Sequence, residues 1–214
     1  VADTETYNYL IDSNGFEGEK RRTLYMSTAQ VSVSGEGDER PEDFSYVNAQ
    51  HWVHLQKEGI GVDALNRTLG KIGACRIESG VYDIIIDRRV AASVVSPLIS
   101  AVRGESLRMK SSFLLDKVGE KIGSDKLTIV DNPRQHGVSG ARLFDNEGIA
   151  VDRLPIVENG VLKNYYISNY LSKKMGVPMT QGGTTIVDFG LGESDTAGLL
   201  RNLARGLYIT GFNG

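Results

Sequence analysis

The chain of 214 residues has a single cysteine, Cys75, and only 5 prolines. One cysteine cannot form an internal disulfide framework or a cysteine-based zinc knuckle, so Cys75 is most simply a small core residue of a cytoplasmic protein. No apolar run approaches the ~20 residues that a membrane-spanning helix needs, and the first residues lack the charged-then-apolar layout of a secretion signal. We therefore expect no membrane partner.

Excess positive charge is also missing. The chain has 24 basic and 27 acidic residues, which gives a net charge of −3. This balance argues against a nucleic-acid partner. The one cationic run, Lys20 to Arg22, is flanked by acidic residues and predicts a solvated turn. The hydrophobic and charged fractions, 40% and 24%, are typical of a globular protein. Because the chain begins with Val1 and ends on a strand-like block, we expect a piece of a longer protein.

Residues 1–80 are predicted to form a first region, a β-meander followed by a helix. Residues 7–12 alternate with period two, and Asn14-Gly15 favours a tight hairpin before strands at 23–35 and 44–50. From residue 51 apolar residues recur at three- and four-residue spacing, which predicts a helix packed on the sheet by that face. These residues are Val62, Leu65, Leu69 and Ile72.

Residues 81–214 are predicted to form a second, mostly β domain that is truncated. Residues 82–87 are typical of a strand covered on both faces, and residues 90–102 of a core helix kinked or split at Pro97. A helix over 111–123 and a strand over 126–131 follow, and Asn159-Gly160 predicts a hairpin within 153–167. Helices over 168–176 and 196–206 and a strand over 207–211 complete an α+β fold of antiparallel β-sheets with packed helices.

No complete catalytic group emerges from the residues alone. His51 and His54 would share a helical face, but a zinc site needs a third protein ligand. His136 lies in a loop with Arg134 and Ser139, without a nucleophile motif. The carboxylates at strand ends and turns are expected to cap backbone groups rather than act as acid and base; they are Asp131, Asp145, Glu147 and Asp152. No phosphate-binding glycine motif follows a strand.

Three long segments resemble the TldD/PmbA family, also called the modulator of DNA gyrase family, and specifically its PmbA (TldE) branch. They read DSNGFEGEKRRTL at 12–24, VSPLISAVRGESLRMKSSFLLDKVGEKIGSDKLTIVDNP at 95–133, and GARLFDNEGIAVDRLPIVENGVLKNYYISNYLSKKMG at 140–176. The likeness runs almost end to end. It implies that this chain is the middle and C-terminal part of such a protein. It further implies a cytosolic bacterial protease system in which TldD and TldE together process peptides or unfolded proteins, including microcin precursors and antitoxins.

The resemblance also implies that this chain lacks the catalytic zinc site. The TldD branch carries the zinc motif HExxxH, and at the matching positions this chain has Ser96, Pro97 and Ala101. None of these side chains binds zinc or supplies a base. The family's cysteine ligand near the C-terminus has no counterpart, since Cys75 lies upstream of the helix. We expect no catalytic or metal-binding residue and no cofactor in this chain, with zinc in a TldD-type partner.

Three hypotheses follow. The first is a non-catalytic TldE/PmbA-type subunit that works with a TldD-type chain on peptide or unfolded-protein substrates. The second is an independent binding or regulatory protein, as the gyrase-modulator name suggests, without a protease partner. The third is an autonomous metallopeptidase that uses His51, His54 and a carboxylate. A homodimer is an additional arrangement open to such a chain. The substrate-binding residues are unknown at this stage.

Overall fold

The computed structural model describes residues 1–212 and has an α+β fold with antiparallel sheets, as predicted. Its contacts divide the chain into two compact units. The first comprises Val1–Glu78 with His136–Ser139, and the second comprises Ser79–Gln135 and the chain from Gly140. Within residues 1–212, no helix combines the length and apolar character needed to cross a bilayer.

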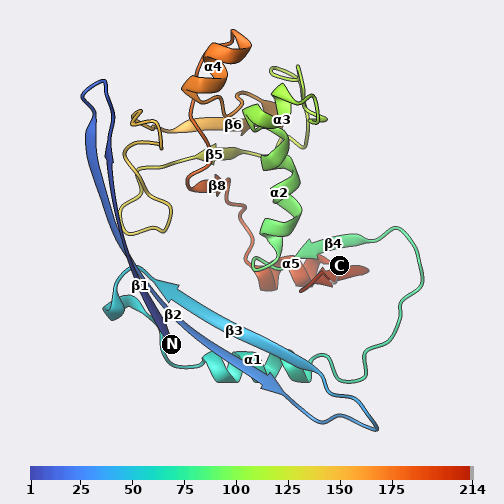
Figure 1. Cartoon of the computed structure of the whole chain (residues 1–214). Helices are drawn as coiled ribbons and strands as arrows, with labels where there is room; N and C mark the ends of the chain where they lie inside the picture. The colour runs from blue at the N-terminus through green and yellow to red at the C-terminus, as the bar shows by residue number, and fades with distance from the viewer. Residues whose placement is uncertain (213–214) are drawn as a thin grey trace. The chain divides into compact units, whose positions relative to one another are not determined.

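The first unit is built on a three-stranded antiparallel sheet with one helix (Figure 1). Strands β1 (Ala2–Ile11), β2 (Glu17–Ser32) and β3 (Glu42–Ala49) lie in that order, followed by the short 3₁₀ helix η1 (Trp52–His54) and by α1 (Ile60–Leu69), which packs on β2 and β3. The predicted Asn14-Gly15 hairpin is confirmed, with Gly15 at φ 91°. The prediction of a solvated turn at Lys20 to Arg22 was wrong. These residues pair with β1 inside β2.

Helix α1 packs by a different face from the predicted one. Its buried positions are Ile60, Ala64 and Thr68. The Thr68 hydroxyl lies 2.8 Å from the Ala64 carbonyl oxygen and 3.1 Å from that of Val31 in β2. Two small residues on this face let the helix approach the sheet closely. The larger residues on the predicted face, Val62, Leu65, Leu69 and Ile72, are 38–63% exposed.

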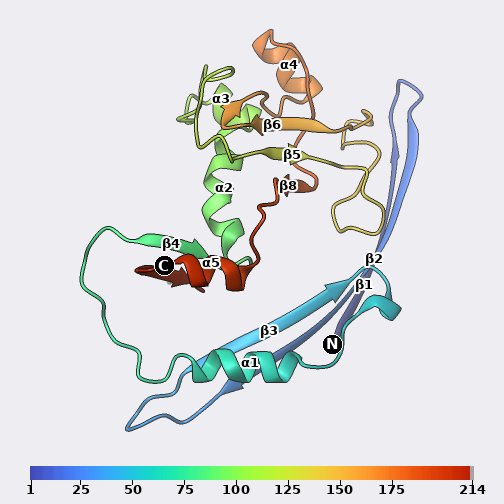
Figure 2. The same ribbon diagram turned by 180° about the vertical axis from the view of Figure 1, so that it is seen from behind.

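Over residues 79–212, the second unit has two small sheets and four helices. Figure 2 shows helix α2 running beside strands β5 and β6. Strands β5 (Ile129–Asp131), β6 (Leu154–Glu158), β7 (Val161–Leu162) and β8 (Val187–Phe189) form an antiparallel sheet of order β7-β6-β5-β8. Strands β4 (Asp83–Ile86) and β9 (Gly206–Ile209) form a parallel pair. The helices are α2 (Ala91–Ala101), α3 (Gly104–Arg108), α4 (Asn169–Met175) and α5 (Thr196–Asn202).

The predicted hairpin and helix after residue 153 are confirmed. Asn159 and Gly160 both have positive φ, 50° and 77°, as a two-residue hairpin turn requires. The Ser168 side chain accepts a hydrogen bond from the Leu171 N–H at the start of α4, and Gly176 ends the helix at φ 70°. Both features arise from contacts between near neighbours in the sequence.

The helix predicted over 111–123 does not form. Asp116 and Gly119 take positive φ, 59° and 89°, which interrupts a helix. The segment instead bonds to the β6–β7 hairpin: the Gly119 N–H donates to the Leu162 carbonyl, and the Ile122 N–H donates to the Gly160 carbonyl, both at 2.8 Å. Pairing with a segment about forty residues away has replaced the local helical periodicity.

Two burial predictions also fail. Cys75 is exposed rather than a core residue, because it lies in a stretch, residues 71–81, that is exposed throughout. Strand β4 is not covered on both faces, since Ile84 is 56% exposed and Ile85 and Ile86 are only partly buried.

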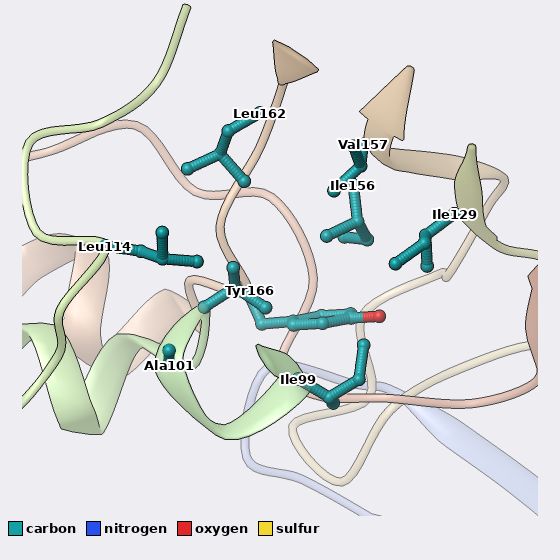
Figure 3. Close-up of a cluster of buried hydrophobic side chains, with 9 residues drawn as sticks. Ile99, Ala101, Leu114, Ile129, Ile156, Val157, Leu162 and Tyr166 are labelled. Carbon is teal, nitrogen blue, oxygen red and sulfur yellow. The ribbon is translucent and has the colours of Figure 1, made fainter. Parts of the chain in front are cut away.

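The main hydrophobic core lies between α2 and the four-stranded sheet. Figure 3 shows the Tyr166 ring between Ile99 of α2 and the sheet residues Ile129 and Ile156. Ile129 and Ile156 are completely buried. This core holds the C-terminal half of α2, the helix that contains Ser96, Pro97 and Ala101.

Candidate functional site

Helix α2 runs through Pro97 as one element, so the predicted split at Ser96-Pro97 does not occur. Proline has no N–H to donate to the carbonyl four residues earlier, which here is that of Ser93. The Ser96 hydroxyl lies 3.3 Å from that same oxygen and donates to it. A side-chain hydrogen bond thus replaces the missing main-chain bond and keeps the helix continuous.

The three positions that the resemblance matches to the zinc motif differ in burial. Ser96 and Pro97 are exposed, whereas Ala101 is only 5% exposed and belongs to the core beneath the helix. The present side chains therefore do not fit zinc: a hydroxyl bonded to the backbone, a proline ring and a buried methyl group supply no metal donor set.

The C-terminal end of α2 is fixed by Tyr166. The Tyr166 N–H donates to the Val102 carbonyl at 2.9 Å, and its carbonyl accepts from the Gly104 N–H at 2.8 Å. A Cβ atom on Gly104 would lie 2.7 Å from that carbonyl oxygen, so only glycine permits this approach. The turn between α2 and α3 is thereby held against the segment that follows β7.

Asp131 is a completely buried carboxylate at the end of β5. It accepts hydrogen bonds from the Tyr166 hydroxyl and the Thr185 N–H, both at 2.8 Å, and from the Thr185 hydroxyl. Burial raises the pKa of Tyr166 well above its ordinary range, and the charge and hydrogen bond of Asp131 raise it further. Arg103 and Arg142 lower that pKa by a smaller amount. Tyr166 is therefore a neutral hydrogen-bond donor that satisfies a buried charge.

The histidines do not form a metal site with other described residues. The rings of His51 and His54 are 5.6 Å apart at exposed positions in and beside η1, and His136 is exposed in its loop with Ser139. Within residues 1–212 there is no group of three or more His, Cys, Asp or Glu side chains that could hold a metal ion. The autonomous-peptidase hypothesis thus has no third ligand in this part of the chain.

The other predicted carboxylates cap backbone groups, as expected. Asp145 accepts from the N–H groups of Glu147 and Ile149 at 2.8 and 3.0 Å. Glu147 accepts from the first two N–H groups of α4 at 3.0 and 3.1 Å. Asp152 accepts from its neighbour's N–H and lies 3.5 Å from Arg134. These contacts give the carboxylates structural roles.

Sequence reasoning missed the partners of Asp131. Tyr166 and Thr185 are 35 and 54 residues away from it in the chain. No spacing rule links positions so far apart. The only signal was a carboxylate at the end of an apolar strand, which is where a capping group is also expected.

Comparisons with known proteins show which family and which solved structures this chain is similar to. Residues 79–214 match the PmbA/TldA metallopeptidase C-terminal domain. Metalloprotease PmbA of Escherichia coli O157:H7 is 26% identical over 187 residues, covering 86% of this chain and 42% of that protein. A crystal structure from Bacteroides thetaiotaomicron, of a protein described as a candidate modulator of DNA gyrase, is 43% identical with a TM-score of 0.97, covering 99% of this chain and 48% of that one.

The fold also matches TldE from Thermococcus kodakarensis, with a TM-score of 0.81 at 22% identity over 97% of this chain and 50% of that one. The chain spans about half the length of the relatives it matches. The family match covers the unit that contains α2, the Tyr166–Asp131 contact and the four-stranded sheet. The chain therefore belongs to the PmbA/TldA metallopeptidase family.

Proposed function

We propose that this chain is part of a non-catalytic TldE/PmbA-type subunit of a cytoplasmic zinc metalloprotease that cleaves peptides or unfolded proteins. The zinc and the HExxxH motif would belong to a TldD-type partner. The proposal is carried by helix α2: the resemblance matches Ser96, Pro97 and Ala101 to the motif positions, and these three side chains supply no metal donor set. The relative named Metalloprotease PmbA supports the link to a metalloprotease, and TldE from Thermococcus kodakarensis shares the fold.

The packing of α2 supports a structural role for this helix. Ala101 contributes to the core, and Tyr166 fixes the chain just beyond it. Histidine at position 101 would add a large polar group to a packed apolar cluster. A simple exchange of side chains would therefore not make α2 a zinc helix.

The first unit has edges suited to binding an extended peptide. The order β1-β2-β3 leaves a ten-residue strand and an eight-residue strand at the two edges of the sheet. An added peptide strand would bond through its main chain, which requires no particular side-chain sequence. This mode suits a subunit that handles many peptides. No nucleic-acid or membrane partner is part of the proposal.

The test uses the full-length protein purified gently from its own cells. Native mass spectrometry should show a complex with a second chain of roughly 50 kDa and one zinc that leaves with that chain. This mass is about twice the 23.3 kDa of the present chain, which covers 42% and 48% of two of its relatives. Cleavage of an unfolded protein should require both chains and should stop when the partner's motif glutamate is replaced by glutamine. Zinc and cleavage in the isolated protein would contradict the proposal.

The described gyrase-modulator relative favours a second candidate, an independent regulatory protein. This candidate predicts that the purified full-length protein changes the supercoiling activity of gyrase without any protease partner. It also predicts that the protein is recovered alone or as a homodimer. A supercoiling assay with and without the TldD-type chain separates the two candidates.

A further inference from the structure

The second unit contains an open pocket of about 290 Å³. Its lining includes none of the candidate functional residues discussed above. Its apolar wall includes Leu107 of α3, Leu115, Met175 of α4 and Val177. Pockets of this size and lining are typical of sites for small molecules or single side chains. It lies among segments that are far apart in the chain, so no sequence pattern indicates it.

The uncharged polar groups of the wall are already engaged within the protein. The Tyr165 hydroxyl donates to one main-chain carbonyl and accepts from a main-chain N–H at 2.9 Å. The Thr180 hydroxyl donates to the Tyr165 carbonyl at 2.5 Å and accepts from the Ile167 N–H at 2.9 Å. The Asn164 amide donates to the Pro155 carbonyl at 2.8 Å. A bound group thus meets mainly apolar surface.

Two charged residues line the pocket, Lys163 and Asp116, and only Lys163 has a partner of opposite charge within residues 1–212. Lys163 lies 3.6 Å from Glu158, which offsets its charge. Asp116 also lines the pocket, and its carboxylate makes no hydrogen bond or ion pair within residues 1–212. Its backbone is in the left-handed region, at φ 59°. Asp116 is therefore the charged lining residue without a partner among residues 1–212, and its negative charge complements a cation.

We propose that this pocket binds a long basic side chain, lysine or arginine, of an extended peptide. The methylene groups of the side chain lie against Leu107, Leu115 and Met175, and its cationic end pairs with Asp116. Lysine and arginine commonly bury their stems on apolar surface while the charge stays near water. The inference rests on the proposed function only in taking peptides as the molecules that this protein meets.

The test measures binding of fluorescein-labelled acetyl-Ala-Ala-Lys-Ala-Ala to the full-length protein by fluorescence polarisation. Replacing lysine by norleucine keeps the stem and removes the charge, and should weaken binding about fivefold at low salt. Replacing it by alanine removes the stem as well and should weaken binding a further tenfold or so. Arginine should bind comparably, and glutamate should bind least. Equal binding of the lysine and norleucine peptides, or no binding, overturns the proposal.

Asp116→Asn is the matching protein variant, because asparagine tolerates the same left-handed backbone. It should remove the preference for lysine over norleucine while leaving the norleucine affinity unchanged. Asp125→Asn is the control: this exposed carboxylate pairs with Lys121 at 2.6 Å and does not line the pocket. Loss of the lysine preference in Asp125→Asn as well, or its persistence in Asp116→Asn, contradicts the proposed site.

The outcome can be separated from that of the proposed function. Partner-dependent cleavage with no preference for basic side chains would leave the subunit assignment in place and remove the pocket assignment. A lysine preference that depends on Asp116, without any cleavage in the presence of a TldD-type chain, would leave the pocket assignment in place and remove the subunit assignment. The lysine preference should also shrink as salt rises from 50 to 500 mM, since screening weakens exposed charge pairs.

Discussion

Replacing Gly160 by alanine should destabilise the second unit strongly. Gly160 has φ 77°, and a Cβ atom there would lie 2.4 Å from the Gly123 carbonyl oxygen and 2.6 Å from that of Ser124. Both neighbours are main-chain atoms and cannot rotate away. The left-handed backbone costs an L-residue about 1–2 kcal/mol, and overpacking adds about 1–3 kcal/mol. The free energy of unfolding should fall by about 2–5 kcal/mol.

Gly15→Ala supplies the matched control. Gly15 also follows an asparagine in a hairpin turn and has φ 91°, but nothing lies within 4 Å of a Cβ atom there. In Gly15→Ala the free energy of unfolding should fall only by the cost of the left-handed backbone, about 1–2 kcal/mol. Urea unfolding of the full-length variants, followed by circular dichroism, measures both losses. Equal losses in the two variants would refute the close approach at Gly160.

Three further variants test the region around α2. Tyr166→Phe leaves Asp131 with one donor fewer and should cost about 1.5–3 kcal/mol in urea unfolding. Folding raises the pKa of Tyr166 above its ordinary value of 10.0, so the free energy of unfolding should fall as pH rises past 10.0, by up to about 1.4 kcal/mol per pH unit. This part of the pH dependence should vanish in Tyr166→Phe. An unchanged slope in the variant would contradict the buried contact. Pro97→Ala should raise the thermal midpoint, because alanine restores an N–H donor for the Ser93 carbonyl; a lower midpoint would contradict the helix geometry. Ala101→His should destabilise by about 2 kcal/mol or more without acquiring zinc in metal analysis, and stoichiometric zinc would contradict the core position of residue 101.

Features that depend on near neighbours were predictable. Both Asn-Gly hairpins and the Ser168-to-Gly176 limits of α4 agree with the structure, because a turn or cap is decided within a few residues. The α+β class and the family also followed from the sequence. Long strings of residues in the right order carried the family resemblance, which the family match confirms.

Features that depend on distant contacts were not predictable. The apolar spacing of α1 suited two faces, and only contact with β2 selected the small residues Ala64 and Thr68 for burial. The segment over 111–123 has helical periodicity, yet pairing with the β6–β7 hairpin gave it an irregular path. In both cases the gain from tertiary packing exceeds the weak preference of the local sequence.

The sequence by itself determined the two Asn-Gly turns, the limits of α4, the fold class and the family. The tertiary structure alone decided that Tyr166 and Thr185 satisfy the buried charge of Asp131, and that Asp116 stands at an apolar pocket. The physical reason is the range of the forces involved. Backbone conformation is set by adjacent residues, whereas burial and charge pairing depend on residues that only folding brings together.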